Sequence, residues 1–193
     1  EANKETTGIY GKYAVSRNLT MEDIEANIKA GKPYVVRLKS TGNHDLPSEE
    51  IRYIKVQDAI RGELSMPENN QDVIILKATG IPTYHFAHVI DDYFMRTTHV
   101  VRGEEWLMSL PIHVELFEKL GFEMPTYCHT AVLMKLDEGN KRKLSKRKDP
   151  ELSLDYYRQE GYHPQAVKEY LLTILNSNFE EWRIENPDAP IDD

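Results

Sequence analysis

Cysteine is almost missing from this sequence, which contains only Cys128. A single thiol allows no disulfide within the chain. It also excludes a cysteine-rich zinc site, because such a site needs several thiolate ligands, and we expect no zinc. A lone thiol without a disulfide framework is typical of proteins in a reducing compartment, so we expect a cytoplasmic protein.

Long apolar runs are missing as well. The longest of them, such as residues 73–76, are far too short to cross a bilayer, and we expect no membrane association. The first residues carry no charged-then-apolar leader, which argues against a secretory signal. The chain begins at Glu1 and not at Met, and this start is compatible with a fragment or with a processed protein.

Positive charge is in short supply, with 24 Lys and Arg against 32 Asp and Glu and a net charge of −8. This balance argues against nucleic-acid binding by the whole surface, because phosphate contacts need Lys and Arg. One local basic patch is present, since six of the eight residues in 141–148 are Lys or Arg. Hydrophobic residues make up 40% of the sequence and are spread throughout, which predicts a folded chain.

Capping residues, helix breakers and apolar spacing predict where helices and strands lie. Thr20 and Asp23 resemble a capping box, and Gly31 and Gly121 each follow a predicted helix end. Helices are predicted over residues 20–29, 83–95, 109–120, 153–161 and 164–175. Strands are predicted over 34–38, 51–63, 73–76, 98–101 and 128–134, and the stretch 51–63 is expected to form paired hairpins. Loops are predicted over 43–50 and 141–148, with a frayed tail from 186.

The order of these elements predicts the fold class. Strand, helix, strand, helix, strand between residues 73 and 134 is the pattern of a parallel sheet with crossover helices, and we expect an α/β fold. The chain is expected to have three parts. These are a mixed α+β segment over about 1–75, half of a parallel α/β domain over about 76–150, and a helical unit over 151–193.

The basic segment 143–147 reads Lys-Leu-Ser-Lys-Arg and follows the last predicted strand. A reaction that releases pyrophosphate from ATP builds negative charge on the leaving group. Lys143 and Lys146 on a mobile loop can reach that charge and stabilise it more in the transition state than in the ground state. The alternative is a solvated basic loop or a nuclear-localisation-like run, because short basic stretches are common.

Several blocks around this segment follow one another in the order known from one protein family. The basic segment resembles the KMSKS loop of class I aminoacyl-tRNA synthetases, in the KLSKR form of the glutamyl-tRNA synthetase family. The other matching blocks are TYHFA at 83–87, VIDD at 89–92, THVVRGEEW at 98–106 and SLDYY at 153–157. The resemblance covers about residues 50–180. Residues 58–62 resemble a further family block, to which no role is assigned.

The resemblance makes the expected fold more specific. It implies the C-terminal half of a Rossmann-type catalytic domain over 76–150. It also implies the latter part of an inserted acceptor-stem-binding domain over 1–75 and the start of a helical stem-contact domain over 151–193. The family joins L-glutamate to tRNA(Glu) through a glutamyl-adenylate. The expected partners are therefore L-glutamate, ATP with Mg²⁺, and tRNA(Glu).

The resemblance also implies roles for single residues. Catalysis falls to Lys143 and Lys146. Glutamate binding falls to Tyr84, His88, Arg102 and Trp106. ATP binding falls to Glu105, Leu133, Met134, Lys143, Leu144, Ser145, Lys146 and Arg147. The backbone of Leu133 and Met134 is expected to contact the adenine, with their side chains in the core.

Other interpretations of these residues stay open. Tyr84 and Trp106 are compatible with core packing, and Arg102 with a surface salt bridge to Glu104 or Glu105. His88 departs from a frequent family pattern with Asn at this place, and its charge would depend on pH. A metal site is an alternative for four residues that share one helix face, namely His85, His88, Asp91 and Asp92.

One family motif is missing from the sequence. The HIGH-like motif, whose histidines stabilise the ATP phosphates, follows no predicted strand here. The expectation is that this chain as written does not activate glutamate, whereas the intact protein does. The alternatives are a non-catalytic tRNA-binding fragment or paralogue, a glutaminyl-type enzyme, and the short enzyme that glutamylates a tRNA base.

Overall fold

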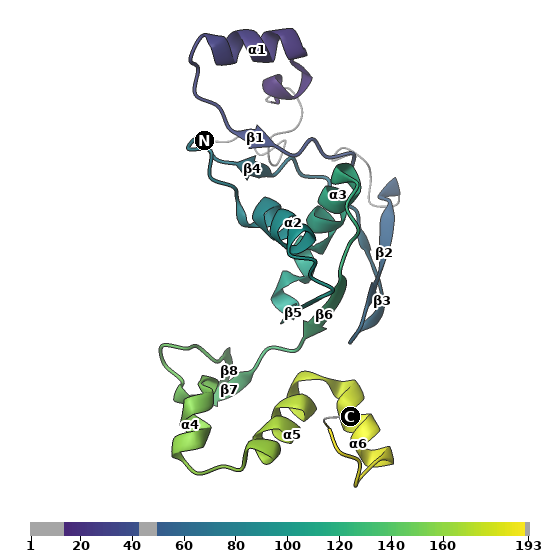
Figure 1. Ribbon diagram of the computed structural model, residues 1–193, viewed down its shortest axis with the longest axis vertical. Helices are drawn as coiled ribbons and strands as arrows, with labels where there is room; N and C mark the ends of the chain where they lie inside the picture. Colours follow the sequence, from purple (N-terminus) through teal and green to yellow (C-terminus); the bar gives the residue numbers. More distant parts are fainter. Residues whose placement is uncertain (1–13, 43–49, 192–193) are drawn as a thin grey trace. The chain divides into compact units, whose positions relative to one another are not determined.

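The computed structural model describes residues 14–42 and 50–191 and divides into two compact units (Figure 1). The first unit holds residues up to 57, Glu63–Val100 and Met108–Thr126, and the second holds Asp58–Gly62, Val101–Leu107 and residues from 127 onward. The predicted loop 43–50 lies outside the described residues except for its last position. Within the described ranges, no helix combines the length and apolar character needed to span a membrane.

Helix α1 (Met21–Lys29) begins at the predicted capping box and follows a short 3₁₀ helix η2 (Val15–Asn18). The Asp23 N–H donates to Thr20 Oγ1 at 3.1 Å, and the Thr20 N–H donates to Asp23 Oδ2 at 3.3 Å. These reciprocal bonds satisfy two amide groups that the first turn leaves without helical partners. Gly31 follows the helix with φ of 69°, a left-handed conformation that ends helices. The predicted start and stop are both confirmed.

Strands β1 (Val36–Arg37) and β4 (Ile74–Leu76) form a small antiparallel sheet. The prediction that 73–76 is a buried strand of the parallel sheet is therefore wrong. All three residues of β4 are half-buried, and the strand pairs with β1. A short apolar run identifies a strand but not its partner, because pairing depends on contacts between segments far apart in the chain.

A second sheet has the strand order β3-β2-β6-β5. Its strands are β2 (Tyr53–Asp58), β3 (Gly62–Pro67), β5 (His99–Gly103) and β6 (Thr126–Thr130). β2 and β3 form the predicted hairpin, and β2 runs parallel to β6 with Asp58 opposite Tyr127. Between β5 and β6, the Thr126 N–H donates to Thr98 O at 2.9 Å and Thr130 Oγ1 donates to Arg102 O at 3.4 Å. The partner's number rises along both strands, so β5 and β6 run parallel. The fold is a mixed α/β fold.

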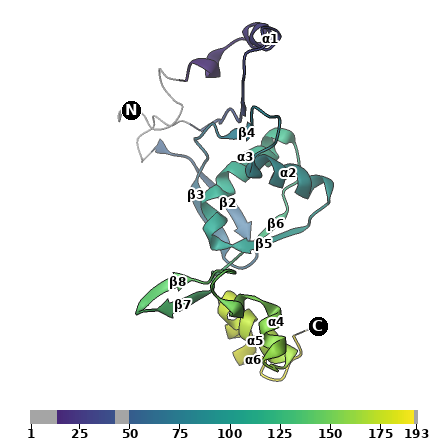
Figure 2. The ribbon, with the colours of Figure 1, turned by 90° about the vertical axis from the view of Figure 1, so that its left-hand side faces the viewer.

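Helices α2 (Tyr84–Phe94) and α3 (Leu110–Leu120) lie side by side in Figures 1 and 2 and carry the core of the first unit. Val89 from α2 packs with Leu116 and Phe117 from α3 and with Leu38, and all four are buried. Both helices begin and end within two residues of their predicted bounds. The 3₁₀ helix η4 (Glu104–Ser109) connects β5 to α3.

Residues 141–148 do not form one continuous loop as the sequence predicts, because 141–143 belong to a strand. β6 ends at Thr130, and a hairpin of β7 (Met134–Asp137) and β8 (Asn140–Lys143) follows (Figure 2). The predictions of one strand over 128–134 and of a loop over all of 141–148 are wrong for this reason. Glu138 and Gly139 turn the hairpin with φ of 49° and 81°, and two positive φ angles match the twist of a tight hairpin.

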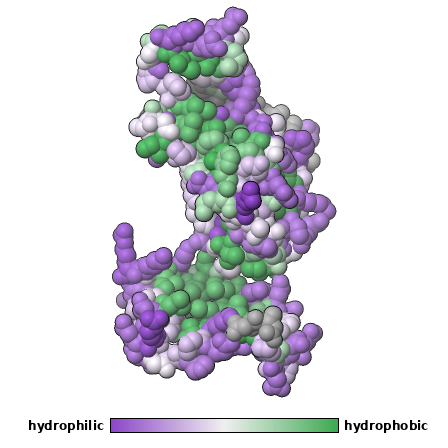
Figure 3. Space-filling view, in the orientation of Figure 1, coloured by the Kyte–Doolittle hydropathy of each residue, from purple (hydrophilic) through white to green (hydrophobic). Residues whose placement is uncertain are grey.

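The second unit ends in helices α4 (Leu154–Gln159), α5 (Pro164–Leu175) and α6 (Ser177–Glu185), with a 3₁₀ turn η5 (Pro150–Leu152) before them. α4 and α5 match the predicted helices, and Ser153 Oγ caps α4 by accepting from the Asp155 N–H at 3.3 Å. Figure 3 shows apolar surface gathered over these helices. The exposed large apolar side chains of this segment include Leu154, Tyr162 and Ile184.

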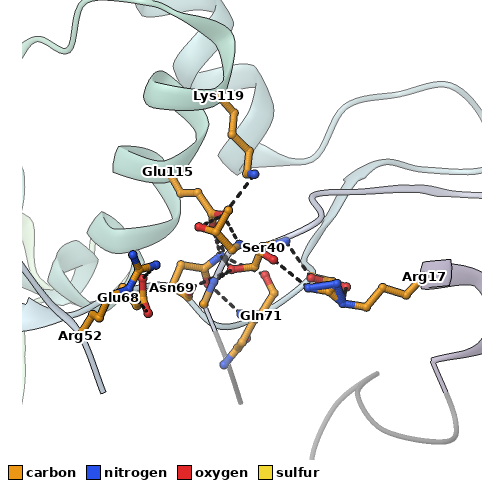
Figure 4. Close-up of polar contacts among 11 residues, drawn as sticks. Arg17, Ser40, Arg52, Glu68, Asn69, Gln71, Glu115 and Lys119 are labelled. Atoms are coloured by element: carbon orange, nitrogen blue, oxygen red, sulfur yellow. Dashed lines mark hydrogen bonds and ion pairs between the residues drawn. The ribbon is translucent and has the colours of Figure 1, made fainter. Parts of the chain in front are cut away.

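A buried carboxylate on α3 holds two loops of the first unit together (Figure 4). Glu115 accepts hydrogen bonds from the Thr41 N–H at 2.7 Å, from Ser40 Oγ at 3.0 Å and from Asn69 Nδ2 at 2.6 Å. The loops approach so closely that a Cβ atom on Gly42 would stand 2.1 Å from the Asn69 carbonyl oxygen. Glycine is therefore required at residue 42, and Glu115 supplies the acceptors that these buried donors need.

Replacing this carboxylate tests the network. Glu115→Ala is expected to lower the free energy of unfolding by about 2–4 kcal/mol, because it leaves several buried donors unpaired. Glu115→Gln keeps one acceptor oxygen and should cost about half as much. Urea unfolding followed by circular dichroism measures both. The control is Glu118→Ala on the exposed side of the same helix, and equal losses for Glu115→Ala and Glu118→Ala would contradict the role of the network.

Candidate active site

Three polar side chains of the second unit lie at the carboxyl ends of neighbouring strands. Asp58 is the last residue of β2, Arg102 precedes the last residue of β5, and His129 precedes the last residue of β6. β6 lies between β2 and β5 in the sheet. Open α/β sheets bind their ligands at this edge, as the sequence predicts for Arg102.

Hydrogen bonds join these three side chains in a line. His129 Nδ1 lies 2.6 Å from Asp58 Oδ2, and the Arg102 Nε–H donates to His129 Nε2 at 2.9 Å. The Arg102 guanidinium carbon lies 4.7 Å from the centre of the Tyr127 ring. Tyr127 and His129 are two residues apart on β6, so both side chains project from the same face of the strand. Asp58, Tyr127 and His129 are all buried.

Burial and hydrogen bonding set the charges in this line. Burial raises the pKa of the Asp58 carboxyl, but hydrogen bonds from His129 and from the backbone N–H groups of Arg61 and Ile60 outweigh it and hold that pKa below its ordinary value. Burial lowers the pKa of His129, and the positive charge of Arg102 acts in the same direction, while Asp58 opposes both. The result is an ionised Asp58 beside a neutral imidazole at neutral pH.

The segment Asp58–Gly62 connects this line to the start of η4. The Arg61 Nε–H donates to the His129 carbonyl oxygen at 3.0 Å, and the same guanidinium forms an ion pair with Glu104. Gly62 has φ of 73°, which the turn between β2 and β3 requires and which glycine adopts at low cost. The segment therefore holds both the end of β6 and Glu104, which follows Arg102 by two residues.

The basic segment pairs with the next acidic residue, Glu105. Lys143 at the end of β8 forms an ion pair and hydrogen bond with Glu105, and this hydrogen bond lowers the pKa of the Glu105 carboxyl. Glu104 pairs with Arg61 and Glu105 with Lys143, so the two acidic residues have separate basic partners. The structure thus brings together the predicted ATP-binding residues Lys143 and Glu105. Trp106, which follows them in η4, is half-buried.

Buried Asp149 closes the turn that contains Ser145 and Lys146. It accepts two hydrogen bonds from Arg142, at 2.7 and 2.8 Å, one from Lys135 at 2.9 Å and one from the Ser145 N–H at 2.7 Å. The Arg142 guanidinium, with the Ser145 N–H and Lys135, holds the pKa of Asp149 well below its usual range. Asp149 is therefore ionised and fixes both ends of the turn.

Two other predicted ATP-binding residues lie before this turn. Leu133 is half-buried and its carbonyl oxygen accepts from the Leu144 N–H at 2.9 Å. Met134 opens β7 opposite Lys143 and its side chain is exposed, so the prediction that it belongs to the core is wrong. Lys146 and Arg147 are exposed in the turn over 146–148.

The remaining predicted glutamate-binding residues, Tyr84 and His88, belong to α2 in the first unit. Their rings stack with centres 5.8 Å apart, and His88 Nδ1 lies 2.6 Å from Asp92 Oδ2. His85 Nδ1 lies 3.0 Å from Nε2 of His113, a buried residue of α3. The metal alternative finds no support, because within 14–42 and 50–191 no three His, Cys, Asp or Glu residues are grouped to hold a metal ion.

Several residues of the site are not identified by sequence reasoning. Asp58 lies in a block that the sequence leaves without a role, and Asp149 follows the basic segment as an ordinary acidic residue. His129 carries one signal, because it lies on the strand predicted over 128–134. His113 carries none beyond its place in a predicted helix.

Comparison with known proteins identifies the relatives of this chain. Residues 4–181 match the family model described as tRNA synthetases class I (E and Q), catalytic domain. The glutamate–tRNA ligase of Acetivibrio thermocellus is 63% identical over 192 residues, and that of Clostridium beijerinckii is 57% identical over 188 residues. These matches cover 100% and 97% of this chain but only 34% and 33% of the relatives. The chain thus spans about a third of their length.

A solved structure gives the same answer. The crystal structure of a glutamate tRNA ligase from Elizabethkingia meningosepticum in complex with its amino acid aligns with a TM-score of 0.60 and 36% identity. The alignment covers 80% of this chain and 32% of that one. On the extent of the family match and the identity to these relatives, the chain belongs to the class I tRNA synthetases for glutamate and glutamine, within their catalytic domain.

Proposed function

We propose that the protein containing this chain is a glutamate–tRNA ligase. In the first step an oxygen of the glutamate α-carboxylate attacks the α-phosphorus of ATP, and the bond to the β-phosphate breaks. Glutamyl-adenylate and pyrophosphate result. In the second step a hydroxyl of the terminal ribose of tRNA(Glu) attacks the acyl carbon, and AMP leaves. The relatives' names and the chemistry of the site support this assignment.

The observation that carries the proposal is the setting of Arg102. Its guanidinium lies at the carboxyl edge of the sheet, against the Tyr127 ring and bonded to His129 through Nε. A guanidinium binds a carboxylate by two parallel hydrogen bonds, and such charged bonds are worth roughly 1.5–3 kcal/mol each. Arg102 therefore binds the side-chain carboxylate of glutamate. Tyr84, His88 and Trp106 are proposed as further glutamate-binding residues.

Lys143 and Lys146 act on the leaving pyrophosphate. Lys143 is held beside Glu105, which is itself two residues after Gly103, at the end of β5. A flexible ammonium at this place can move from the carboxylate to a polyphosphate that carries more charge. The ATP contacts that we propose beside these lysines are those of Glu105, Leu133, Met134, Leu144, Ser145 and Arg147.

The finer fold assignment belongs to the same proposal. Residues 76–150 form the second half of a Rossmann-type catalytic domain, residues 1–75 the latter part of an inserted acceptor-binding domain, and residues 151–193 the start of a stem-contact domain. The protein acts in the cytoplasm. Mg²⁺ would enter bound to the phosphates of ATP and to water, which are its usual ligands, and would neutralise part of the phosphate charge. No side chain in the described residues is assigned to it.

The proposal is tested by exchange of labelled pyrophosphate into ATP, catalysed by the complete protein in the presence of tRNA. Exchange is expected to require L-glutamate and to fail with L-glutamine, because the amide carries no charge for a guanidinium to bind. Equal exchange with glutamine would indicate the glutaminyl-type enzyme. A protein that binds tRNA(Glu) but shows no exchange with either amino acid would be the non-catalytic paralogue.

A further inference from the structure

We propose that Asp58 and His129 are positioning residues that orient the Arg102 guanidinium for a carboxylate substrate. The inference rests on the proposed function of Arg102 and adds two residues to that site. It also assigns a role to the segment Asp58–Gly62. Neither Asp58 nor His129 needs to touch the substrate, since both act through Arg102.

The hydrogen bond between Arg102 and His129 fixes the tautomer of the imidazole. A guanidinium can only donate, so His129 Nε2 at 2.9 Å from Arg102 Nε must be the acceptor. The ring proton of the neutral imidazole is then on Nδ1, which donates to Asp58 Oδ2 at 2.6 Å. An imidazolium carries a proton on Nε2, and that N–H would face the Nε–H of Arg102. The neutral tautomer with its proton on Nε2 would have the same conflict.

Asp58 is anchored more firmly than one hydrogen bond would allow. Its Oδ1 accepts from the backbone N–H groups of Ile60 at 2.9 Å and Arg61 at 3.0 Å, and the His129 N–H donates to Oδ2 at 3.1 Å. These bonds fix the carboxylate at the end of β2, opposite Tyr127. The neighbouring Arg61 is a second charged group close to the ring, because its Nε–H donates to the His129 carbonyl oxygen.

The line of bonds determines which donors of Arg102 face a ligand. Engaging Nε through His129 fixes the rotation of the guanidinium plane, and the Tyr127 ring 4.7 Å away supports one face of it. The terminal Nη2 is buried as well. The guanidinium is therefore held in one fixed plane, in which it can meet a carboxylate. Holding a binding group in its productive orientation removes an ordering cost that would otherwise weaken substrate binding.

Two substitutions at His129 separate positioning from a purely structural role. In His129→Gln the side-chain oxygen reaches the place of Nε2 and can still accept from Arg102, but the bond to Asp58 is lost. In His129→Asn the amide group reaches the place of Nδ1 and can still donate to Asp58, but Arg102 loses its acceptor. Steady-state exchange kinetics on the complete protein give KM for glutamate, KM for ATP and kcat for each variant.

Positioning predicts that His129→Asn raises KM for glutamate by about tenfold to a hundredfold, the range of losses seen when an orienting partner is removed. KM for ATP should stay unchanged. His129→Gln should stay within about threefold of wild type, because its side-chain oxygen accepts from Arg102 without a ring proton for Asp58 to fix. Equal losses in both variants, or a larger loss in His129→Gln, would overturn the inference. Parallel increases in both KM values would do the same, because they would indicate a general structural role.

A measurement that needs no activity accompanies the kinetics. ¹⁵N NMR of the complete protein with labelled histidine is expected to show His129 with a protonated Nδ1 and an unprotonated Nε2 at neutral pH. An imidazolium or the opposite tautomer in the wild-type protein would contradict the inference, and this result does not depend on whether the variants fold. If wild-type protein shows this tautomer but no glutamate-dependent exchange, the proposed function fails while the arrangement of the three side chains stands.

Discussion

On the proposed function, exchange of pyrophosphate into ATP by the complete protein is expected to fall by about a hundredfold or more in Lys146→Ala, with little change in KM for glutamate. Lys146 is exposed in a turn whose two ends are fixed by Asp149, so its loss should leave the turn in place. The expected effect is on kcat, because the negative charge that Lys146 meets develops as pyrophosphate departs. Exchange rates at saturating ATP and glutamate measure it.

The matched control is Lys148→Ala. Lys148 occupies the same turn, is also exposed and carries the same charge. It should retain exchange within about twofold of wild type if the effect belongs to one ammonium group and not to the net charge of the segment. Equal losses in the two variants would mean that the basic segment acts as a diffuse electrostatic surface, and Lys146 would then have no individual role.

Arg102→Lys is expected to lower kcat/KM for glutamate by about a hundredfold to a thousandfold, although it keeps the positive charge. An ammonium cannot form two parallel bonds to a carboxylate in a fixed plane. Lysine also has no counterpart of the Nε–H that Arg102 donates to His129. The loss should appear mainly in KM for glutamate, while KM for ATP changes little.

Arg158→Lys serves as the control for this substitution. Arg158 lies in α4 of the same unit, and its exposed side chain makes a long ion pair with Asp155, at 3.8 Å. No kinetic constant should change, since exposed pairs of this kind contribute little. If Arg102→Lys raised KM for both substrates alike, Arg102 would be a structural residue, and glutamate recognition would have to be assigned to other side chains.

Local signals in the sequence predict the helices well. The capping box of Thr20 and Asp23, the proline that opens α5 and the left-handed Gly121 each act within one turn of the chain, and each is found where it is predicted. Such signals are reliable because the groups that they satisfy are neighbours in sequence. The hairpin of β2 and β3 is predicted for the same reason.

Pairing between distant segments is what the sequence does not reveal. β4 pairs with β1 and not with the parallel strands, and the strand expected over 128–134 stops at Thr130. The candidate site divides in the same way. Arg102 and Lys143 are predicted from local blocks. Their partners, His129 for Arg102 and Glu105 for Lys143, lie beside them only because strands and a hairpin that are far apart in sequence end close together.

The hydrogen bonds of Asp149 and Glu105 have a consequence for how the protein responds to ionic strength. Arg142 is already neutralised by Asp137 and Asp149, and Lys143 by Glu105. A polyanion that approaches 141–148 therefore displaces fewer bound counterions than the six basic residues suggest. The salt dependence of its binding should be correspondingly shallow, since each displaced counterion adds to the slope. Acidic side chains of the same chain thus act as intramolecular counterions, which a more highly charged phosphate has to replace.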